Sequence, residues 1–596
     1  MKKRLMNIAA AVIAAFVITG CSIIKLPFNV NKPTQDSKIP QEQTEEDKKL
    51  DEFLDEQFID TLSQSTVNMH FRLKDPESMG IERPEKGTFG ESGYDEQENA
   101  EEYLKLKEEL DKIDREKLSE ESKNDYDFII KYIDYLIVLN EYPQFSTELD
   151  PNYGIAEGVK SVLSSYKFYV ERDVLDYFDL IDEAEEVFSC AIEQEKDKEE
   201  QYRIADFTAQ ATIENIDTFL SDEGSELIES FSERLSQCEG LSEDKIKEYA
   251  EKNEEAVSSK LLPAYKKLRE DILSIGSENG LNKGLIYYDG GEEYYSALLS
   301  YMSFSDRTPE EIADKIVDRT TEIAKRSTEL FSKYTEQATT SDFNDLTADD
   351  ILQLLKKSTA KEYPELKDIS YTVEEIPSSL RTGNTLAYYT MAPLDDADIN
   401  LINYDPAEDD DAEFFITLSH EGYPGHMYQW NYFIENDEPK LFMSIENTGY
   451  LEGWAMYTGI NSLKYCDFEK AGVPAEYLIE LYSLNEEYGY LMSALCDIFV
   501  NYYGYTKENL EDFLTERGFE KQAADSLYET VIETPGLYPR YYCSYLELVN
   551  IREKAEQSLG NKFDVKEFNT LILDTGICYY SQLEETVDKY IDKKAA

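Results

Sequence analysis

The residues best suited to chemistry are two histidines that lie six positions apart in a chain with only three histidines among its 596 residues. His420 and His426 bound the segment His-Glu-Gly-Tyr-Pro-Gly-His, and Glu421 follows the first of them. Imidazole is the commonest metal ligand in proteins, and an adjacent carboxylate can act as a ligand or as a general base. The two histidines and the glutamate therefore predict a metal site.

The spacing differs from that of the usual zinc-binding helix. In His-Glu-x-x-His the two histidines are four positions apart and share one helical face. A six-residue step turns roughly 120° round a helix, so a regular helix cannot direct both imidazoles at one ion. Pro424 and Gly425 favour an opened helix that brings His426 back beside His420. The alternative is that His426 points elsewhere and Glu421 is a ligand.

A catalytic zinc site needs a third protein ligand and an open position. Glu452 lies 26 residues after His426, on a segment with the pattern of the next helix, and is the expected third ligand. Glu446 is a weaker candidate. Trp430 and Trp454 are the two tryptophans of the chain and lie in these two segments, which indicates that both segments are buried and packed together.

These residue types predict hydrolysis by an activated water. Zinc lowers the pKa of a bound water toward about 7. Glu421 is the expected general base, which takes the proton of the water and passes it to the leaving amine. An oxyanion then needs a hydrogen-bond donor, and tyrosine is the expected one because the third histidine, His70, is distant in sequence. Position alone does not distinguish among 45 tyrosines.

The fold that positions these residues is predicted to be mainly helical, with one small sheet beside the metal-binding helix and a cleft between helical walls. Apolar spacings of three and four predict helices over 100–115, 121–141, 155–200, 243–275, Thr308–Glu336 and Thr347–Ser358. Short runs rich in β-branched and aromatic residues predict strands at Ile369–Ile376, Leu386–Ala392 and Ile399–Tyr404. A helix is expected from about Asp411, and helices dominate from Tyr477. We predict an N-terminal helical region at 47–275 and a catalytic region at 276–596, with the sheet at about 369–404.

The N-terminus predicts export. A basic start precedes an apolar run from Ile8 to Ile18, which is too short to span a bilayer and is typical of a secretory signal. Small residues before Cys21 resemble a bacterial lipobox, so we expect a signal peptide at 1–20, lipidation of Cys21 and a flexible tether over 21–46. The protein would then be anchored to the cell membrane on its extracytoplasmic face. The alternative is an ordinary signal with an incidental cysteine.

Composition excludes several classes of protein. Asp and Glu number 125 against 59 Lys and Arg, a formal charge of −66, which excludes a nucleic-acid binder that relies on bulk charge. Disorder is excluded by 41% hydrophobic and 12% aromatic residues. The cysteines after Cys21 are too sparse for a disulfide framework, although one or two bridges remain open.

At the metal motif the sequence resembles a family of bacterial, often lipoprotein-type, proteins catalogued as a domain of unknown function and grouped with the gluzincin zinc metallopeptidases. Its members carry His-Glu-x-x-Pro-Gly-His followed by Glu-Gly-Trp-Ala-x-Tyr, which here are His420–His426 and Glu452–Tyr457. Further likenesses extend over most of the chain, at Phe58–Gly80, Gly290–Tyr295, Thr534–Arg552 and Gly560–Gly576.

The resemblance implies a zincin-like fold, zinc ligation by His420, His426 and Glu452, and Glu421 as the base. It also implies Tyr541 as the donor to the oxyanion. The chain departs from the family pattern at accessory positions, where Met427, Asn501 and Asn569 replace histidines and Leu537-Tyr538 replaces Gln-Ala. The metal set is intact, so the departures bear on transition-state stabilisation and substrate preference.

The leading hypothesis is an extracytoplasmic, membrane-tethered zinc peptidase. An extended peptide substrate would add to the edge of the small sheet at Leu386–Ala392. Two other functions remain open: a non-catalytic peptide-binding lipoprotein, and a metal-dependent amidase that acts on cell-wall material.

Overall fold

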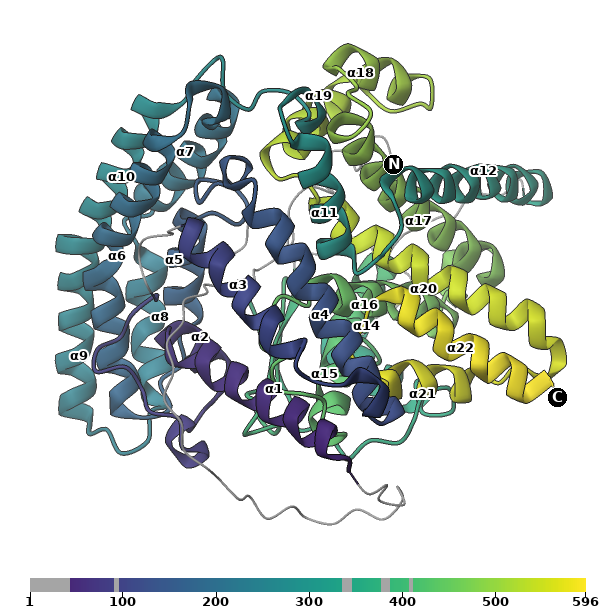
Figure 1. The fold of residues 1–596 in the computed structure, drawn as a ribbon, viewed down its shortest axis with the longest axis horizontal. Helices are drawn as coiled ribbons and strands as arrows, with labels where there is room; N and C mark the ends of the chain where they lie inside the picture. Colours follow the sequence, from purple (N-terminus) through teal and green to yellow (C-terminus); the bar gives the residue numbers. More distant parts are fainter. Residues whose placement is uncertain (1–42, 91–95, 335–345, 377–385, 407–410, 596) are drawn as a thin grey trace.

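A computed structural model describes residues 43–90, 96–334, 346–376, 386–406 and 411–595 (Figure 1). The chain is mainly helical and has one three-stranded sheet, as the sequence predicts. The predicted signal peptide, Cys21 and most of the tether lie outside the described residues. The first helix begins at Glu45, within the last residues of the predicted tether, where the Thr44 side chain accepts a hydrogen bond from the Asp47 amide and caps it.

The N-terminal half consists of two groups of helices. The first group is α1 (Glu45–Ser63), α2 (Thr66–Arg72), α3 (Glu96–Leu110) and α4 (Glu120–Asn140). The second group is α5 (Ile155–Ser165), α6 (Glu171–Asp197), α7 (Asp206–Ser221), α8 (Ser225–Ser236), α9 (Glu243–Ala256) and α10 (Leu262–Ile275). The pattern at 155–200 is therefore two helices, separated at 166–170. The second group forms a layer at one side of the molecule with its own apolar core (Figure 1).

The first group packs differently from the second. Buried residues of α1 and α4 belong to the same large core as the C-terminal helices, while the α5–α10 layer is organised around a separate cluster. Helices α1 and α4 thus share their packing with the elements that carry His420, His426 and Glu452.

The remaining helices enclose the motif residues. They are α11 (Gly291–Ser303), α12 (Pro309–Lys333), α13 (Ala348–Thr359), α14 (Asp411–Glu421), α15 (His426–Glu435), α16 (Thr448–Ser462), α17 (Ala475–Asn501), α18 (Lys507–Thr515), α19 (Lys521–Glu533), α20 (Leu537–Leu559), α21 (Val565–Thr575) and α22 (Tyr580–Ala595). Both tryptophans are about 1% exposed, which confirms that their segments are buried.

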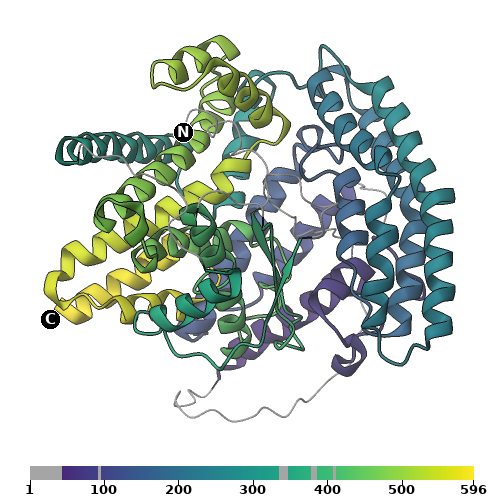
Figure 2. The same ribbon diagram turned by 180° about the vertical axis from the view of Figure 1, so that it is seen from behind.

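The three predicted strands form one sheet with the order β1-β3-β2. Strands β1 (Thr372–Glu375) and β3 (Leu401–Tyr404) are parallel, and β2 (Ala387–Thr390) is antiparallel to β3. The sheet lies near the middle of the molecule, between the N-terminal layer and the C-terminal helices (Figure 2). β2 is an edge strand, as predicted, and the chain runs from β3 toward α14.

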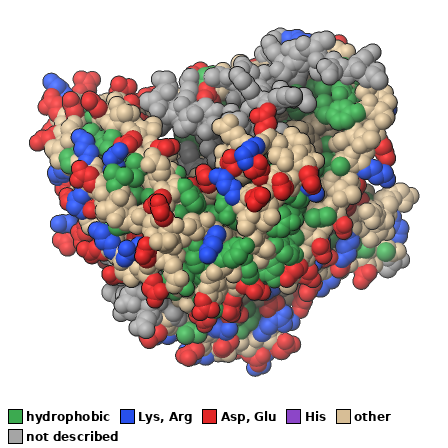
Figure 3. All heavy atoms as spheres, turned by 90° about the horizontal axis from the view of Figure 1, so that it is seen from above, with side chains coloured by type: hydrophobic (Ala, Val, Ile, Leu, Met, Phe, Trp, Pro, Cys, Tyr) green, Lys and Arg blue, Asp and Glu red, His purple; other side chains and the backbone are tan. Residues whose placement is uncertain are grey.

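The surface reflects the composition. Asp and Glu side chains are spread over the face seen in Figure 3, with Lys and Arg between them, rather than collected in one patch. All six cysteines in the described residues are free thiols. Among the described helices none is both long and apolar enough to cross a membrane.

Candidate metal centre

The helix opens where the sequence predicts it. α14 ends at Glu421 and α15 begins at His426, with a non-helical link at 422–425. The link passes so close to the preceding turn that a Cβ at Gly425 would lie 1.8 Å from the carbonyl oxygen of His420, so only glycine fits there. The Trp454 indole donates a hydrogen bond to the Pro424 carbonyl (2.9 Å), which ties the link to α16.

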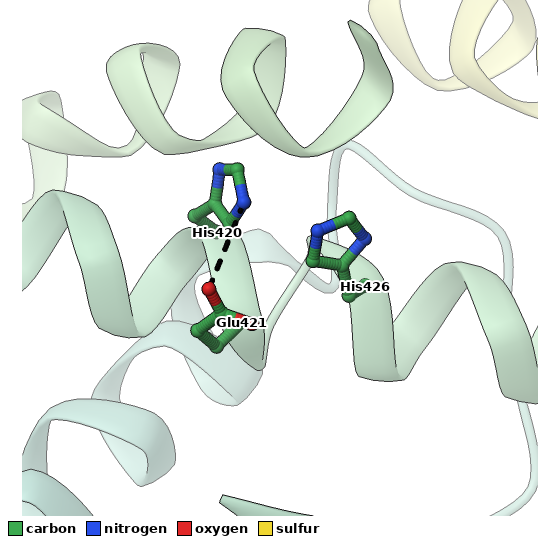
Figure 4. A group of neighbouring side chains, drawn as sticks. All are labelled: His420, Glu421 and His426. Carbon is green, nitrogen blue, oxygen red and sulfur yellow. Dashed lines mark ion pairs between the residues drawn. The ribbon is translucent and has the colours of Figure 1, made fainter. Parts of the chain in front are cut away.

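This break brings the two histidines together. The ring centroids of His420 and His426 are 4.6 Å apart and the rings are nearly perpendicular. One donor atom from each of His420, Glu421 and His426 lies within 4.8 Å of the others. Figure 4 shows the three side chains meeting between the last turn of α14 and the first turn of α15.

Glu452 of α16 contacts both histidines. Its Oε2 lies 3.2 Å from His420 Nε2 and its Oε1 lies 3.5 Å from His426 Nε2. Zinc bonds of 2.0–2.1 Å in a tetrahedron put neighbouring donor atoms about 3.3 Å apart, so these separations suit one zinc ion. The buried Oε2 atom has no well-formed hydrogen bond that would occupy it. The two histidines and Glu452 therefore fit a zinc ion.

The electrostatics of the three side chains agree with this geometry. Burial alone would raise the pKa of Glu452, but His426 and His420 outweigh it and lower that pKa to about 2. Burial would lower the pKa of His420, and the carboxylates of Glu421 and Glu452 reverse the direction. The pair of imidazoles thus keeps the Glu452 carboxylate ionised, as a metal ligand must be.

Glu421 is placed differently from Glu452. Its Oε1 is 3.7 Å from His420 Nε2, and its Oε2 accepts a hydrogen bond from the Tyr389 amide of β2 (2.9 Å). Burial raises the pKa of Glu421, and the Glu452 charge adds to the rise. A carboxylate with a raised pKa, next to the donor set and fixed by a backbone amide, suits a general base. Glu446 accepts a hydrogen bond from the Thr448 amide (2.8 Å) and, unlike Glu452, forms no ion pair with either histidine in the described part of the chain.

Tyr541, in the first turn of α20, is buried with its hydroxyl lacking a well-formed hydrogen bond. Its pKa is raised far above the ordinary tyrosine value by burial first, and then by Tyr153 and Glu452. Because Glu452 affects the pKa of Tyr541, the Tyr541 hydroxyl lies within electrostatic range of this expected metal ligand. The hydroxyl also interacts with that of Tyr153, and the contact falls short of a well-formed hydrogen bond.

His70 has no part in the centre. Its ring is 5% exposed and stacks on Tyr166 with centroids 3.8 Å apart, and its Nε2 accepts a hydrogen bond from the Lys167 amide (3.2 Å). Burial lowers its pKa to about 4, against an opposing effect of Asp173. His70 is therefore a neutral core residue.

The buried neutral His70 predicts a pH-dependent stability. Because the folded pKa of about 4 lies below the ordinary histidine pKa of 6.5, the unfolded chain binds the proton more readily between these values. The free energy of unfolding should fall as pH drops from 6.5 to 4, by up to about 3 kcal/mol from this group. Denaturant unfolding of wild type and His70→Gln should show a shallower fall in the variant. Equal slopes would contradict the assignment.

The positions where the family pattern has histidines carry structural contacts here. The Asn501 amide donates to Asp497 (3.0 Å) and to the Val531 carbonyl (2.8 Å). The Asn569 amide donates to the Glu362 carbonyl (2.9 Å), and Met427 is fully buried.

A family model described as "Bacterial protein of unknown function (DUF885)" matches residues 79–587. The chain belongs to this family. No curated protein matches the sequence. Two solved structures resemble this DUF885 chain. One, a "putative lipoprotein" from Colwellia psychrerythraea, has 17% identity and a TM-score of 0.77, covering 92% of this chain and 99% of its own. The other, a "putative lipoprotein of unknown function" from Shewanella oneidensis, has 15% identity and a TM-score of 0.60, covering 91% of this chain and 99% of its own. At these identities the likeness shows the fold alone.

Several residues that lie near the histidine motif of this DUF885 chain belong to no sequence motif that could identify them. The amide that holds Glu421 is a backbone group of Tyr389, which no side-chain pattern could identify. Arg72 and Arg540 come from distant parts of the chain and are buried beside residues of this region. Their unusual feature, the lack of both a carboxylate and a backbone carbonyl partner in the described residues, exists only in the folded structure.

Proposed function

We propose that this protein is an extracytoplasmic, membrane-tethered zinc peptidase. The observation that carries the proposal is the pair of contacts from Glu452 to His420 and His426, at 3.2 and 3.5 Å, with Glu421 held beside them. Bound zinc would lower the pKa of a bound water to about 7, and its positive charge would polarise the carbonyl group of the substrate. His420, His426 and Glu452 would hold the ion.

Glu421 is the proton carrier in this proposal. It takes a proton from the attacking water and delivers it to the amine that leaves. The Tyr389 amide donates to one carboxylate oxygen and so leaves the other for the proton. Burial raises the pKa of Glu421 above its ordinary value, which favours the protonated form that transfer to the amine requires.

Tyr541 would donate its hydroxyl proton to the oxyanion that forms on the substrate carbonyl. Its hydroxyl is buried, lacks a well-formed hydrogen bond and is protonated at neutral pH because burial raises its pKa. A donor that is already oriented and desolvated stabilises developing charge without reorganising water. This supports Tyr541 among the many tyrosines.

The sheet supports a peptide as substrate. The Tyr389 amide points away from β3 and toward Glu421, so the free edge of β2 faces the proposed base. A peptide that pairs with this edge would present its backbone beside the donor set. Membrane tethering is inferred from the sequence at Cys21 and agrees with the word lipoprotein in the descriptions of both structural relatives.

Product profiling tests the proposal. The purified protein, loaded with zinc, is incubated with a diverse peptide mixture and with peptidoglycan fragments, and products are identified by mass spectrometry with and without a chelator. We expect new peptide products that the chelator abolishes. Cleavage of peptidoglycan fragments alone would favour an amidase, and no cleavage of either would favour a binding lipoprotein.

A further inference from the structure

Two buried arginines near the elements of the proposed metal centre have neither a carboxylate nor a backbone carbonyl partner in the described residues. Arg72 ends α2 and Arg540 is in the first turn of α20, and each is 9% exposed. In the described part of the chain Arg72 makes no side-chain hydrogen bond or ion pair, and its Cζ lies 5.7 Å from the centroid of the Trp430 ring. Arg540 donates to the Met302 sulfur (2.7 Å), while its Nε is buried with no partner.

The other arginines of the described chain behave differently. Each of them donates to a carboxylate or to a backbone carbonyl oxygen, as Arg319 does to Glu487 and Arg234 does to the carbonyls of Leu163 and Tyr166. A chain with 125 acidic residues has no shortage of partners. Because a buried charge without a partner is unfavourable, the two exceptions need an explanation.

Arg72 lies close to one side of the metal ligands. Trp430, whose ring it faces, is one helical turn after His426 and therefore on the same face of α15. The Trp430 indole donates to the Ala392 carbonyl (2.8 Å), and the Arg72 carbonyl accepts from the Leu394 amide (2.8 Å). Arg72 is thus fixed at the segment that follows the edge strand β2.

Arg540 approaches from another side. It immediately precedes Tyr541, and its Cζ lies 5.0 Å from the centroid of the Tyr153 ring. Tyr153 in turn has its pKa raised by burial, with Glu452 among the smaller causes. Arg540 and the proposed oxyanion donor therefore belong to one cluster that extends to the metal ligands.

One carboxylate influences both arginines without neutralising them. Glu446 acts on the pKa of Arg72 and of Arg540, yet it forms no ion pair within 4.0 Å with either of them. Burial lowers the pKa of Arg72 only to about 10, so its guanidinium is charged at neutral pH. Asp150 is a second carboxylate that interacts with Arg540 at longer range, and neither guanidinium forms a direct ion pair in the described residues.

We propose that Arg72 and Arg540 bind a carboxylate of the substrate beside the metal centre, either the C-terminal carboxylate of a peptide or the side chain of an Asp or Glu residue. The planar guanidinium matches a carboxylate with two parallel hydrogen bonds. The inference rests on the proposed peptidase function for its substrate class. It implies a preference for cleavage close to a C-terminus or close to an acidic residue.

The test measures binding and does not depend on turnover. Calorimetry of the zinc-loaded Glu421→Gln protein would compare three probes: acetyl-Ala-Phe-Ala as the free acid, the same peptide as an amide, and acetyl-Ala-Phe-Glu amide. We expect at least tenfold tighter binding of the free acid than of the first amide. Equally tight binding of the Glu amide would assign the site to side-chain carboxylates. Equal affinities for all three, or no measurable binding, would overturn the proposal.

Variants assign the effect to the two arginines. Arg72→Gln and Arg540→Gln should each abolish the preference for a carboxylate, and the Lys variants should retain part of it. Arg234→Gln, at an arginine of the α5–α10 layer, is the matched control and should keep the preference. Circular dichroism and zinc content exclude misfolding. A preference that persists in both Gln variants would overturn the assignment.

Hydrolysis separates this inference from the proposed function. Wild-type cleavage of free-acid and amidated peptides at equal rates would retain the peptidase and reject the carboxylate site. A carboxylate preference in binding without any hydrolysis would retain the carboxylate site and reject the peptidase.

Discussion

Replacing Glu421 by Gln is expected to slow peptide hydrolysis by about three orders of magnitude while one zinc ion per protein stays bound. The amide is nearly the same size as the carboxylate and can still meet the Tyr389 amide through its oxygen. It cannot take a proton from water at neutral pH. Turnover of a peptide found by product profiling, together with metal analysis of the same preparation, measures both effects.

Glu435→Gln provides the matched control. Glu435 is the last residue of α15 and accepts a hydrogen bond from the Lys367 amide, outside the donor set. Its variant should keep wild-type turnover and zinc content. Unchanged turnover in Glu421→Gln would reject Glu421 as the base. Loss of zinc together with turnover would instead identify Glu421 as a ligand, which is the alternative that the sequence leaves open.

Glu421 and Glu452 differ in their contacts and in the direction of their pKa shifts. The carboxylate is closer to the backbone amide of Tyr389, at 2.9 Å, than to His420 Nε2, at 3.7 Å. The carboxylate of Glu452 is nearer to both histidines and carries the lower pKa. The structure therefore favours the ionised form of Glu452, beside the imidazoles, and the protonated form of Glu421. Opposite pKa shifts of this kind are typical of paired carboxylates with separate roles.

The sequence alone predicts the parts of this site that depend on the backbone preferences of neighbouring residues. Proline and glycine at 424–425 predict the break between α14 and α15, because their backbone restrictions act wherever they occur. The three strands follow from short β-branched and aromatic runs bounded by turn residues. These features need no knowledge of which segments meet in space.

The features that depend on tertiary convergence were outside the reach of local patterns. Glu452 was selected by its position on the following helix and by family resemblance, and only the packing of α16 against α14 sets its distance from the histidines. Arg72 and Arg540 are 468 positions apart and each is unremarkable in its own segment. Their significance comes from burial without a carboxylate or backbone carbonyl partner in the described residues, which the sequence of a strongly acidic chain does not indicate.

The charge of the chain has a different meaning at the surface and at the centre. Acidic side chains are spread over the outside, where water solvates them. Around the metal motif the carboxylates are few, and each has a specific contact: Glu421 with a backbone amide, Glu452 with two imidazoles, and Glu446 with the Thr448 amide. The net charge of −66 therefore says little about the sign of the field that a substrate meets.

Replacing Glu452 by Ala should raise the dissociation constant for zinc by more than about 100-fold, because an outer-shell change alone costs 10- to 100-fold and this change removes a direct ligand. In excess zinc, a 100-fold loss of affinity removes about 2.7 kcal/mol of zinc-dependent stabilisation. The rise in Tm on adding zinc, which wild type should show, would then shrink or vanish. Metal titration and thermal unfolding with and without zinc measure these effects.

Glu446→Ala distinguishes the two candidate third ligands. Glu446 lies six positions before Glu452 and accepts a hydrogen bond from the Thr448 amide, so its removal should leave zinc affinity and the zinc-dependent rise in Tm unchanged. If Glu452→Ala binds zinc as wild type does while Glu446→Ala does not, the ligand assignment is reversed. If both variants keep full affinity, Glu421 becomes the third ligand and Glu452 a partner that orients the two histidines. The contacts of 3.2 and 3.5 Å favour Glu452, since they bring its two oxygens as close to the Nε2 atoms of both imidazoles as neighbouring ligands of one zinc ion lie to each other.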